Sequence, residues 1–564
     1  MDVLAGQHRE PRAHTGTTRP GSLPVLRATN LERLSRAAFD VLVIGGGING
    51  AVSASALACR GASVALVDRG DFAGGTSQAS SNLAWGGIKY LEQRELGLVH
   101  DLCRARNDLL RSYPATVQEI RFFVAHPRAF RHPRWALLAG AWLYWAVGHF
   151  FTRRPRLLTI AELEREEPII DTARLDGGIE YSDAYFHDND ARFVWGFVRT
   201  ALDHGCAAAN YVAAVESRHE GGGWITSARD VISGRPLTIR SRLLVNACGP
   251  HADGVNAVNG VPTTHRHVFS KGVHLIVDRL TPHSRVLTFF ADDGRLFFVI
   301  PMGPVTAIGT TDTPVDRPEV VVTPDDRRFV LDNINRRLRL RRPLQEADVI
   351  AERCGVRPLV TEGAAGDVAD WMQLSRRHAV ETDPARHHVT IFGGKLTDCL
   401  NVGEELCEHV ARLGVKLPFP DHVWYGEPPA SVREEYFHQA RLMGLDERTA
   451  PRASERLSRR LWRRYGAGAL PMLDTIRTNP RMADVIIETS EYSRAELDEA
   501  AQREMVVKLE DFLVRRSKIA LVVRREDLLA ASGLRDACRI LFGDQADARL
   551  AEYFRSTGSA PPSA

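Results

Sequence analysis

The amino-acid sequence predicts an α/β fold with an added antiparallel sheet and a helical C-terminal domain. The first observation behind this prediction is a strand–helix–strand unit between Asp40 and Asp68. The second is a group of four strand-like runs between Val273 and Asp312, which predicts an antiparallel sheet. The third is the stretch after the linker Tyr425 to Ser431, which shows helical periodicity and no glycine-rich loop.

The strand–helix–strand unit has all its parts in register. Apolar Val41 to Ile44 predicts the first strand, a small-residue stretch from about Ala51 to Arg60 predicts the helix, and Val64 to Val67 predicts the second strand. Glycines separate the first strand from the helix in the order G-x-G-x-x-G. This combination is the fingerprint of a Rossmann-like dinucleotide-binding domain.

Three glycines and one acid have separate roles in such a unit. Gly45 permits the tight turn, Gly47 lets a pyrophosphate approach the backbone at a helix N-terminus, and Gly50 lets helix and strand pack closely. Asp68 ends the second strand, 18 positions after Gly50. Its carboxylate is placed to accept hydrogen bonds from a ribose.

Later segments favour FAD over a nicotinamide cofactor. A hydroxyl-rich run begins at Thr76, and glycine turns follow predicted strands near Gly249 and Gly394. FAD is long and threads its domain, whereas an NAD enzyme usually reads its cofactor in one contiguous half. The further cofactor-binding residues predicted here are Thr76, Ser77, Ser80, Asn82, Leu83, Ala247, Gly249, Gly394, Leu396 and Thr397.

Eight strings between about Phe39 and Lys416 resemble one known family. They are IGGGINGA, TSQASSNLAWGGIKYLE, EYSDAYFHDNDAR, LVNACGP, KGVHLIV, IGTTD, GVRPL and FGGKLT. The chain resembles the FAD-dependent glycerol-3-phosphate dehydrogenases of bacteria and mitochondria. The resemblance implies oxidation of sn-glycerol 3-phosphate to dihydroxyacetone phosphate, with electrons passed to membrane quinone. It also implies a cytoplasmic protein bound peripherally to the cytoplasmic face of the membrane; a homodimer is left open.

Oxidation of a secondary alcohol phosphate by a flavin requires a base and cations. His274, in SKGVHLIV, is the first choice for the base or for the group that polarises the hydroxyl. Arg357 is a candidate for binding phosphate or stabilising the developing alkoxide, and Lys395 for stabilising reduced flavin or contacting the substrate. The structural alternatives are a histidine bonded to a neighbouring strand and an arginine in a core salt bridge.

Further substrate contacts follow from the resemblance. Lys89, Tyr90 and Arg376 match family positions, although Arg377 beside Arg376 competes for that assignment. Relatives often have arginine where this chain has Lys89, and histidine where it has Trp85. Lysine keeps the positive charge but loses the bidentate fork.

Composition excludes several classes of protein. Charged residues are 25% of the 564 and the net charge is +3, so no nucleic-acid partner is expected. The eight cysteines are scattered without a C-x-x-C pair. This pattern argues against a disulfide framework, a zinc site and an Fe–S cluster, and suits a reducing compartment. No metal site is predicted.

The domain boundaries are read from shifts in composition. Residues 1–37 are expected to be a disordered N-terminal extension, and residues 38–415 an FAD-binding domain with an interleaved substrate domain. Residues 425–545 are expected to be the helical domain, and 550–564 a disordered tail.

One apolar stretch, Trp135 to Phe151, carries no Asp, Glu, Lys or Arg. At this length it is at the short limit for a membrane span. Its tryptophans are typical of a membrane interface. A transmembrane helix, a buried helix and a partly exposed interfacial helix are the three interpretations.

Other functions remain open at this point. The same half-reaction could end at oxygen, as in a glycerol-3-phosphate oxidase. A flavin amine or amino-acid oxidase shares the fold class but would require a carboxylate-binding arginine and a dry amine pocket. A flavin-binding regulatory protein without turnover would not require His274, Arg357 and Lys395.

Overall fold

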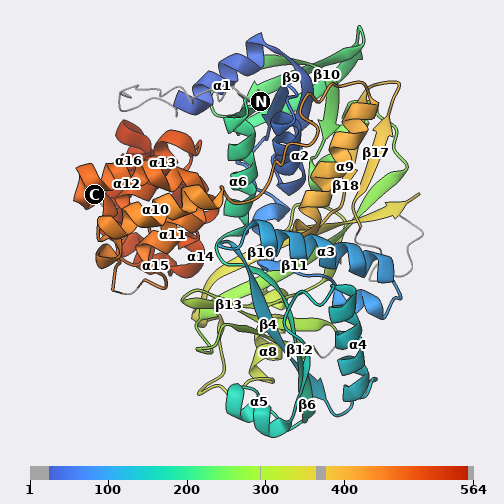
Figure 1. Ribbon diagram of the computed structural model, residues 1–564, viewed down its shortest axis with the longest axis vertical. Coiled ribbons are helices and arrows are strands. Elements are labelled where there is room, and N and C mark those ends of the chain that lie inside the picture. The colour runs from blue at the N-terminus through green and yellow to red at the C-terminus, as the bar shows by residue number, and fades with distance from the viewer. Residues whose placement is uncertain (1–24, 292–293, 364–376, 452, 557–564) are drawn as a thin grey trace, which may run out of the picture.

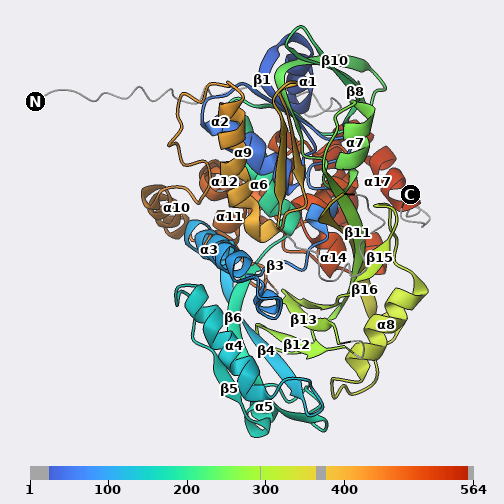
Figure 2. The same cartoon turned by 90° about the vertical axis from the view of Figure 1, so that its right-hand side faces the viewer.

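The computed structural model describes residues 25–291, 294–363, 377–451 and 453–556. Two β-sheets lie one above the other in Figure 1, and the orange and red C-terminal helices pack against their side. Figure 2, turned by a quarter, shows the C-terminal helices behind the upper sheet. The predicted α/β architecture with a helical C-terminal domain is confirmed.

The upper sheet has eight strands and is mainly parallel. Its order is β17–β18–β10–β1–β2–β7, with the β8–β9 hairpin joined to β10 through β9. The strands are β1 (Ala38–Ile44), β2 (Val64–Val67), β7 (Ala207–Ala209), β8 (Val212–Glu220), β9 (Gly223–Asp230), β10 (Pro236–Asn246), β17 (Ala379–Asp383) and β18 (His388–Phe392). The predicted strand–helix–strand unit is β1, α2 (Ile48–Cys59) and β2, with β1 parallel to β2.

Alternation along β1 explains how this sheet is covered on both faces. Val41 and Val43 pack with α2, α6 (Asp190–Asp203) and α9 (Cys399–Arg412) in one core cluster. Leu42 and Ile44 point to the opposite face and pack with α1 (Val25–Arg36) and the β8–β9 hairpin. Successive side chains of a strand point to opposite faces, so an apolar run is required wherever both faces are buried.

The lower sheet has ten strands in the order β15–β11–β14–β13–β12–β4–β6–β3, with β16 added to β11 and β5 to β6. The strands are β3 (Leu83–Ala84), β4 (Val117–Pro127), β5 (Arg156–Leu158), β6 (Leu175–Phe186), β11 (His265–Asp278), β12 (Arg285–Phe290), β13 (Leu296–Met302), β14 (Val305–Gly309), β15 (Thr313–Val315) and β16 (Val349–Glu362). The four predicted runs are β11 to β14. Pairing is antiparallel except between β4 and β12, which run parallel.

Helices line the outside of the lower sheet and the junction between the two sheets. They are α3 (Leu96–Ser112), α4 (Arg134–Val147), α5 (Ile160–Glu166) and α8 (Pro324–Asn335), whereas α7 (Ala252–Val258) packs on β10 and β18 of the upper sheet. In Figure 1, α3 lies between the sheets and α4 on one flank of the lower sheet.

The C-terminal domain is helical, as predicted. It contains α10 (Ala430–Leu442), α11 (Leu457–Tyr465), α12 (Ala469–Thr478), α13 (Arg494–Arg503), α14 (Ile519–Val522), α15 (Arg525–Ala530), α16 (Gly533–Phe542) and α17 (Ala546–Ser556). A π-helical turn spans Asp511–Arg516. Two apolar clusters form its core, one around Leu461 and Trp462 and one around Phe512 and Leu513.

The expectation that both ends of the chain are disordered is wrong for the residues that the structure describes there. Residues Val25–Arg36 form helix α1, because Leu31 and Leu34 pack on the outer face of the upper sheet and Arg27 bonds Asp230 at 2.6 Å. Helix α17 continues past residue 550, because Leu550 and Phe554 are buried in the C-terminal core. Residues 1–24 and 557–564 lie outside the described range.

Helix α4 decides between the interpretations of the apolar stretch. It has 14 residues, and Ala141 and Tyr144 are its buried ones. Trp135 is 71% exposed, and Trp142 and Leu143 are also exposed. The buried-helix interpretation is therefore wrong. Across the described ranges, none of the helices combines the length and the apolar character that a membrane crossing requires.

Candidate active site

One cavity of about 1970 Å³ collects nearly all of the predicted site residues. It is lined by both sheets and by the C-terminal helices. The predicted residues that line it are Gly45, Gly47, Asp68, Thr76, Ser77, Ser80, Leu83, Lys89, Tyr90, Ala247, Gly249, His274, Arg357, Gly394, Lys395, Leu396 and Thr397. Arg376 lies outside the described residues. The volume exceeds that of a typical small-ligand pocket and has room for a dinucleotide together with a substrate.

Backbone geometry shapes the dinucleotide end of the cavity. Gly45 has φ +103°, and a Cβ atom there would lie 2.5 Å from the carbonyl oxygen of Ala247. Gly47 is the N-cap of α2, so the helix N-terminus faces the cavity. Backbone N–H groups at such a position bind a pyrophosphate.

Gly50 and Asn82, which were also assigned to the cofactor site, are not among the residues that line the cavity. Gly50 packs α2 against the turn, and a Cβ atom there would lie 1.8 Å from the carbonyl oxygen of Gly45. Asn82 is buried, donates to the carbonyl oxygen of Asp188 at 2.9 Å and accepts from Arg353. Its side chain therefore fixes the loop and does not face the cofactor.

Asp68 lies where the ribose acid is expected, at the end of β2. Its two carboxylate oxygens accept hydrogen bonds from the backbone N–H groups of Gly46 at 2.6 Å and Gly70 at 2.8 Å. Burial raises the pKa of this carboxyl, while the two N–H groups act to lower it. A carboxylate oxygen accepts more than one hydrogen bond, so Asp68 retains capacity for a ribose.

The hydroxyl-rich run combines cavity lining with local structure. Thr76 Oγ1 donates to the carbonyl oxygen of Val356 at 2.8 Å, which ties the run to β16. Ser77 Oγ accepts from the N–H of Ile48 at 2.9 Å and so caps the first turn of α2. These bonds hold the run against the glycine turn.

At the other end of the cavity, β11 presents His274. The residue is 3% exposed, and neither ring nitrogen has a hydrogen-bond partner within the described part of the chain. Burial, followed by the charges of Arg357 and Arg353, lowers its pKa to about 3. The imidazole is therefore neutral near pH 7 and is not the strand-bonded histidine of the structural alternative.

Arg357 reaches the same end of the cavity from β16. Its guanidinium donates to Thr310 Oγ1 at 3.0 Å and pairs with Asp312 Oδ1 at 3.2 Å. Gly272, opposite Gly355 on the paired strands, makes room for it, since a Cβ atom at Gly272 would lie 2.4 Å from the guanidinium. Arg357 therefore does form a salt bridge, with Asp312, and this salt bridge holds it at the wall of the cavity.

Lys395, Tyr90 and Lys89 form a third group. Lys395 follows Gly393 and Gly394, whose φ angles are +62° and +93°, so the turn demands glycine. Its Nζ lies 4.2 Å from the centre of the Tyr90 ring, and Lys89 Nζ lies 5.4 Å from the same ring. Trp85, one of the departures from the family pattern, also lines the cavity and donates its Nε1–H to the Tyr181 hydroxyl at 3.1 Å.

Comparison with known proteins places the chain. Residues 40–394 match the family of FAD dependent oxidoreductases, and residues 434–539 match the C-terminal domain of alpha-glycerophosphate oxidase. Glycerol-3-phosphate dehydrogenase 2 of Mycobacterium tuberculosis is 32% identical, covering 88% of this chain and 84% of the relative. The chain belongs to the FAD-dependent glycerol-3-phosphate dehydrogenase family.

Two further similarities agree with this family. The aerobic glycerol-3-phosphate dehydrogenase of Escherichia coli is 29% identical, covering 85% of this chain and 93% of the relative. The glycerol-3-phosphate dehydrogenase of Bacillus halodurans, solved in complex with FAD, has a TM-score of 0.70 at 24% identity, covering 95% of this chain and 97% of that one. The latter likeness supports the fold. FAD is the cofactor of this family, and the glycine turn, Asp68 and the cavity fit it.

Sequence reasoning missed two features of this flavoprotein's site. Lys508, Glu510 and Arg515 reach the cavity from the C-terminal domain, where no motif marks them. His378 lies behind the Gly394 turn and bonds Asp398 at 2.6 Å and Glu405 at 2.8 Å. Burial acts to lower the pKa of His378, but these two carboxylates raise it to about 9. Neither feature has a spacing signal, because the partners are distant in sequence.

One group of potential metal ligands lies elsewhere. The donor atoms of Cys59, His204 and His422 are within 4.8 Å of one another. None of the three lines the cavity, and both histidines are exposed. Burial raises the pKa of the Cys59 thiol to about 11, which disfavours the thiolate that binds metals.

Proposed function

We propose that the protein oxidises sn-glycerol 3-phosphate to dihydroxyacetone phosphate and passes the electrons to membrane quinone. The observation that carries this proposal is the reaction end of the cavity. There, a neutral, buried His274 faces the same space as Arg357, Lys395 and Lys89. The dinucleotide-binding turn opens into that space too.

His274 is proposed to accept the proton of the substrate's C2 hydroxyl. A neutral imidazole has one acceptor nitrogen, and burial keeps the ring neutral before substrate binds. A phosphate dianion near Arg357 would offset the cationic charge that lowers the pKa of His274. Substrate binding would therefore make the histidine a stronger base at the moment when the proton must leave.

The cations are proposed to hold the phosphate and the developing alkoxide. Arg357 can bind an oxyanion through two N–H groups, while Lys395 and Lys89 act as point charges close to the Tyr90 ring. Bound FAD supplies the acceptor for the substrate's C2 hydride. Arg376 is retained as a family-based proposal for substrate binding.

A membrane-facing surface is proposed on α4 and the turn after it. Trp135, Trp142, Leu143 and Phe150 are between 42% and 71% exposed. Arg131 and Arg153 flank this surface and have exposed side chains. Aromatic side chains flanked by arginines are typical of a surface that enters the headgroup region of a bilayer. We therefore propose peripheral binding at the cytoplasmic face, where quinone is accessible.

The decisive experiment is anaerobic addition of sn-glycerol 3-phosphate to the purified FAD-bound protein, with flavin absorbance as the readout. Bleaching is expected with this substrate and not with glycerol, which lacks the phosphate. Subsequent re-oxidation by a soluble quinone, much faster than by air, is expected of a dehydrogenase. Absence of bleaching would overturn the substrate, and faster re-oxidation by air would make the protein an oxidase.

The membrane proposal has its own test. The double substitution Trp135→Glu and Trp142→Glu should abolish co-sedimentation with anionic lipid vesicles and leave flavin bleaching unchanged. Val423→Glu, at a residue that is 71% exposed elsewhere on the surface, is the matched control and should still bind. Equal binding by both variants would contradict the assignment of this surface.

A further inference from the structure

A single loop, residues 68–78, forms one wall of the dinucleotide end of the cavity. It begins at the ribose acid Asp68 and ends at the helix-capping Ser77 and at Gln78, and all three line the cavity. Backbone bonds tie the loop to the glycine turn, since the Ala73 N–H donates to the Gly46 carbonyl oxygen at 2.9 Å. The shape of this loop therefore sets the shape of the cofactor site.

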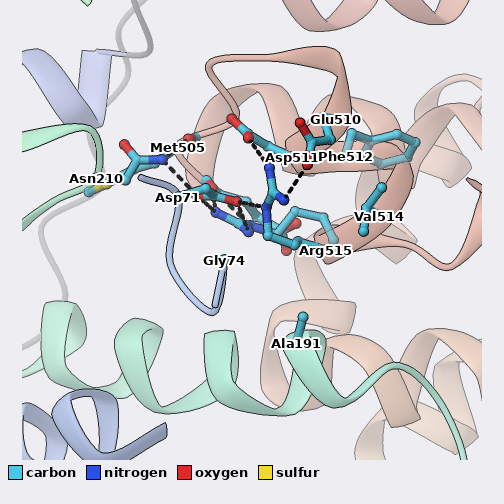
Figure 3. Close-up of polar contacts among 12 residues, drawn as sticks. Asp71, Gly74, Ala191, Asn210, Met505, Glu510, Asp511, Phe512, Val514 and Arg515 are labelled. Atoms are coloured by element: carbon cyan, nitrogen blue, oxygen red, sulfur yellow. Dashed lines mark hydrogen bonds and ion pairs between the residues drawn. The ribbon is translucent and has the colours of Figure 1, made fainter. Parts of the chain in front are cut away.

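The middle of the loop is held by the C-terminal domain through Asp71. This carboxylate is 3% exposed and lines the cavity. Arg516 binds it in a bidentate manner at 2.8 and 2.9 Å, and Arg515 Nε donates to it at 2.7 Å. Asn210 donates the fourth hydrogen bond at 2.8 Å. Figure 3 shows Asp71 on its loop facing Arg515, with Asn210 beside it.

Arg515 also holds the end of the loop. It donates to Gln78 Oε1 at 3.2 Å and to Glu510 Oε1 at 2.9 Å, and it lines the cavity itself. Its remaining nitrogen donates to Asp511 at 2.7 Å, within the π-helical turn. Two consecutive arginines of one turn thus converge on a single loop from another domain, and π-helical turns frequently occur at functional sites.

The C-terminal side of the contact has partners in both domains. Asp511 is fully buried and accepts from the Tyr211 hydroxyl at 2.7 Å and from the backbone N–H groups of Val507 and Lys508 at 2.8 Å each. Tyr211 donates its own N–H to the Gly70 carbonyl oxygen at 2.7 Å, in the cofactor loop. The cofactor loop and the C-terminal turn are therefore also connected before Asp71, where Tyr211 links Gly70 to Asp511, and after it, where Arg515 bonds Gln78.

Because Asp71 is buried, the contact between its loop and the C-terminal domain forms or breaks as a unit. If the C-terminal domain separated, the carboxylate of Asp71 would lose three of its four hydrogen bonds and both of its ion-pair partners. A buried charge without a partner is strongly unfavourable, so the loop would rearrange toward water. The cofactor wall and the docked domain therefore exist together.

We propose that the C-terminal helical domain completes the FAD site, with Asp71, Arg515 and Arg516 as positioning residues that couple FAD binding to domain docking. The proposal needs FAD as the cofactor and is independent of the identity of the substrate. Coupling between two events is reciprocal. FAD must therefore stabilise docking by the same factor by which docking strengthens FAD binding.

The test uses full-length protein from which FAD has been removed and to which it is added back. Asp71→Asn keeps the shape of the side chain and removes the charge. It should raise the dissociation constant of FAD about tenfold. In wild type, FAD should slow hydrogen exchange at the amides of residues 505–517, and Asp71→Asn should lose most of that protection.

Arg524→Gln is the matched control. Arg524 belongs to the same domain and bonds Asp278 of the lower sheet at 3.0 Å, but it is not among the residues that line the cavity. Its affinity for FAD should equal that of wild type. Arg515→Gln is the second variant should Asp71→Asn fail to fold, with the same expected loss. FAD affinity unchanged in a folded variant, or no FAD-dependent protection of residues 505–517 in wild type, would overturn the proposal.

Discussion

The two ends of the cavity are built by different means. At the dinucleotide end, the cofactor site consists of backbone: a glycine turn, a helix N-terminus and an acid that is held by two N–H groups. At the reaction end, the site consists of side chains from β11, β16 and the turn after β18, which are far apart in sequence. The ring nitrogens of His274 there have no hydrogen-bond partner among the described residues.

This difference separates binding from chemistry. The backbone fixes the shape of this end, and the N–H groups at the helix N-terminus remain available to a cofactor pyrophosphate. A buried polar ring without a partner costs free energy, which is tolerated at sites where a substrate supplies the missing bond. Substitutions at one end should therefore remove the flavin, and substitutions at the other should remove turnover while the flavin stays.

The largest effect is expected from Gly45→Val at the dinucleotide end. The new side chain would meet the Ala247 carbonyl oxygen at 2.5 Å and would require an L-residue at φ +103°. The protein should purify without the long-wavelength absorbance of bound flavin, because the side chain would block the approach of the pyrophosphate. Gly254→Ala, at a helical glycine with open space around its Cβ position, is the control and should keep its flavin. A Gly45→Val protein that purifies with bound flavin would contradict the assignment of cofactor binding to this end of the cavity.

His274→Gln should give the next largest effect. Loss of a general base lowers the rate by roughly 10²- to 10⁴-fold, and glutamine keeps a hydrogen-bonding side chain of similar length. Stopped-flow bleaching of the flavin at saturating substrate measures the step directly. The flavin content should equal that of wild type. Bleaching at the wild-type rate would show that another group takes the proton.

Arg357→Ala should reduce kcat/KM by about a hundredfold, because it removes a cation from the wall that faces the substrate. FAD should remain bound. Arg266→Ala, at an exposed position on the same strand as His274, is the control. A loss confined to kcat would assign Arg357 to the developing alkoxide, and a loss confined to KM would assign it to the phosphate. Unchanged kinetics would contradict both roles.

The smallest effect concerns His378, beneath the Gly394 turn. Its folded pKa of about 9 lies above the ordinary value of 6.5, so the folded state binds the proton more tightly. The resulting stability is fully present below pH 6.5 and is lost as the pH rises through 9. The free energy of unfolding of His378→Gln should therefore be lower than that of wild type at pH 6, by roughly 3 kcal/mol at most. Above pH 10 the two free energies should be equal. A stability difference between the variant and wild type that persists above pH 10 would contradict the assignment of this stability to protonated His378.

His274 should behave in the opposite sense. Its pKa falls from 6.5 to about 3 in the folded state, so the unfolded chain binds the extra proton between these values. This histidine therefore lowers stability as the pH falls below 6.5, whereas His378 contributes most there. Burial acts to lower the pKa of both rings, but Asp398 and Glu405 outweigh it at His378, whereas His274 faces two arginines.

Local sequence predicted the dinucleotide end well. The strand Val64–Val67 was predicted with its observed bounds, and the glycine turn with its acid was correctly placed. These features depend on contacts within about thirty residues, where periodicity and turn chemistry dominate. Asn82 was assigned to the cofactor because a polar side chain at this position suits FAD. In the structure its side chain accepts a hydrogen bond from Arg353, which is distant in sequence.

The sequence by itself determined the βαβ unit, the FAD cofactor, the helical C-terminal domain and part of the residues that gather in the cavity; Lys508, Glu510 and Arg515 carried no sequence signal. Only the tertiary structure decided that residues 25–36 form a helix, that α4 exposes its aromatic side chains and that Arg515 and Arg516 bind Asp71. The physical reason is the range of the interactions. Turns and periodic apolar patterns are local, whereas a buried carboxylate finds its partners more than four hundred residues away.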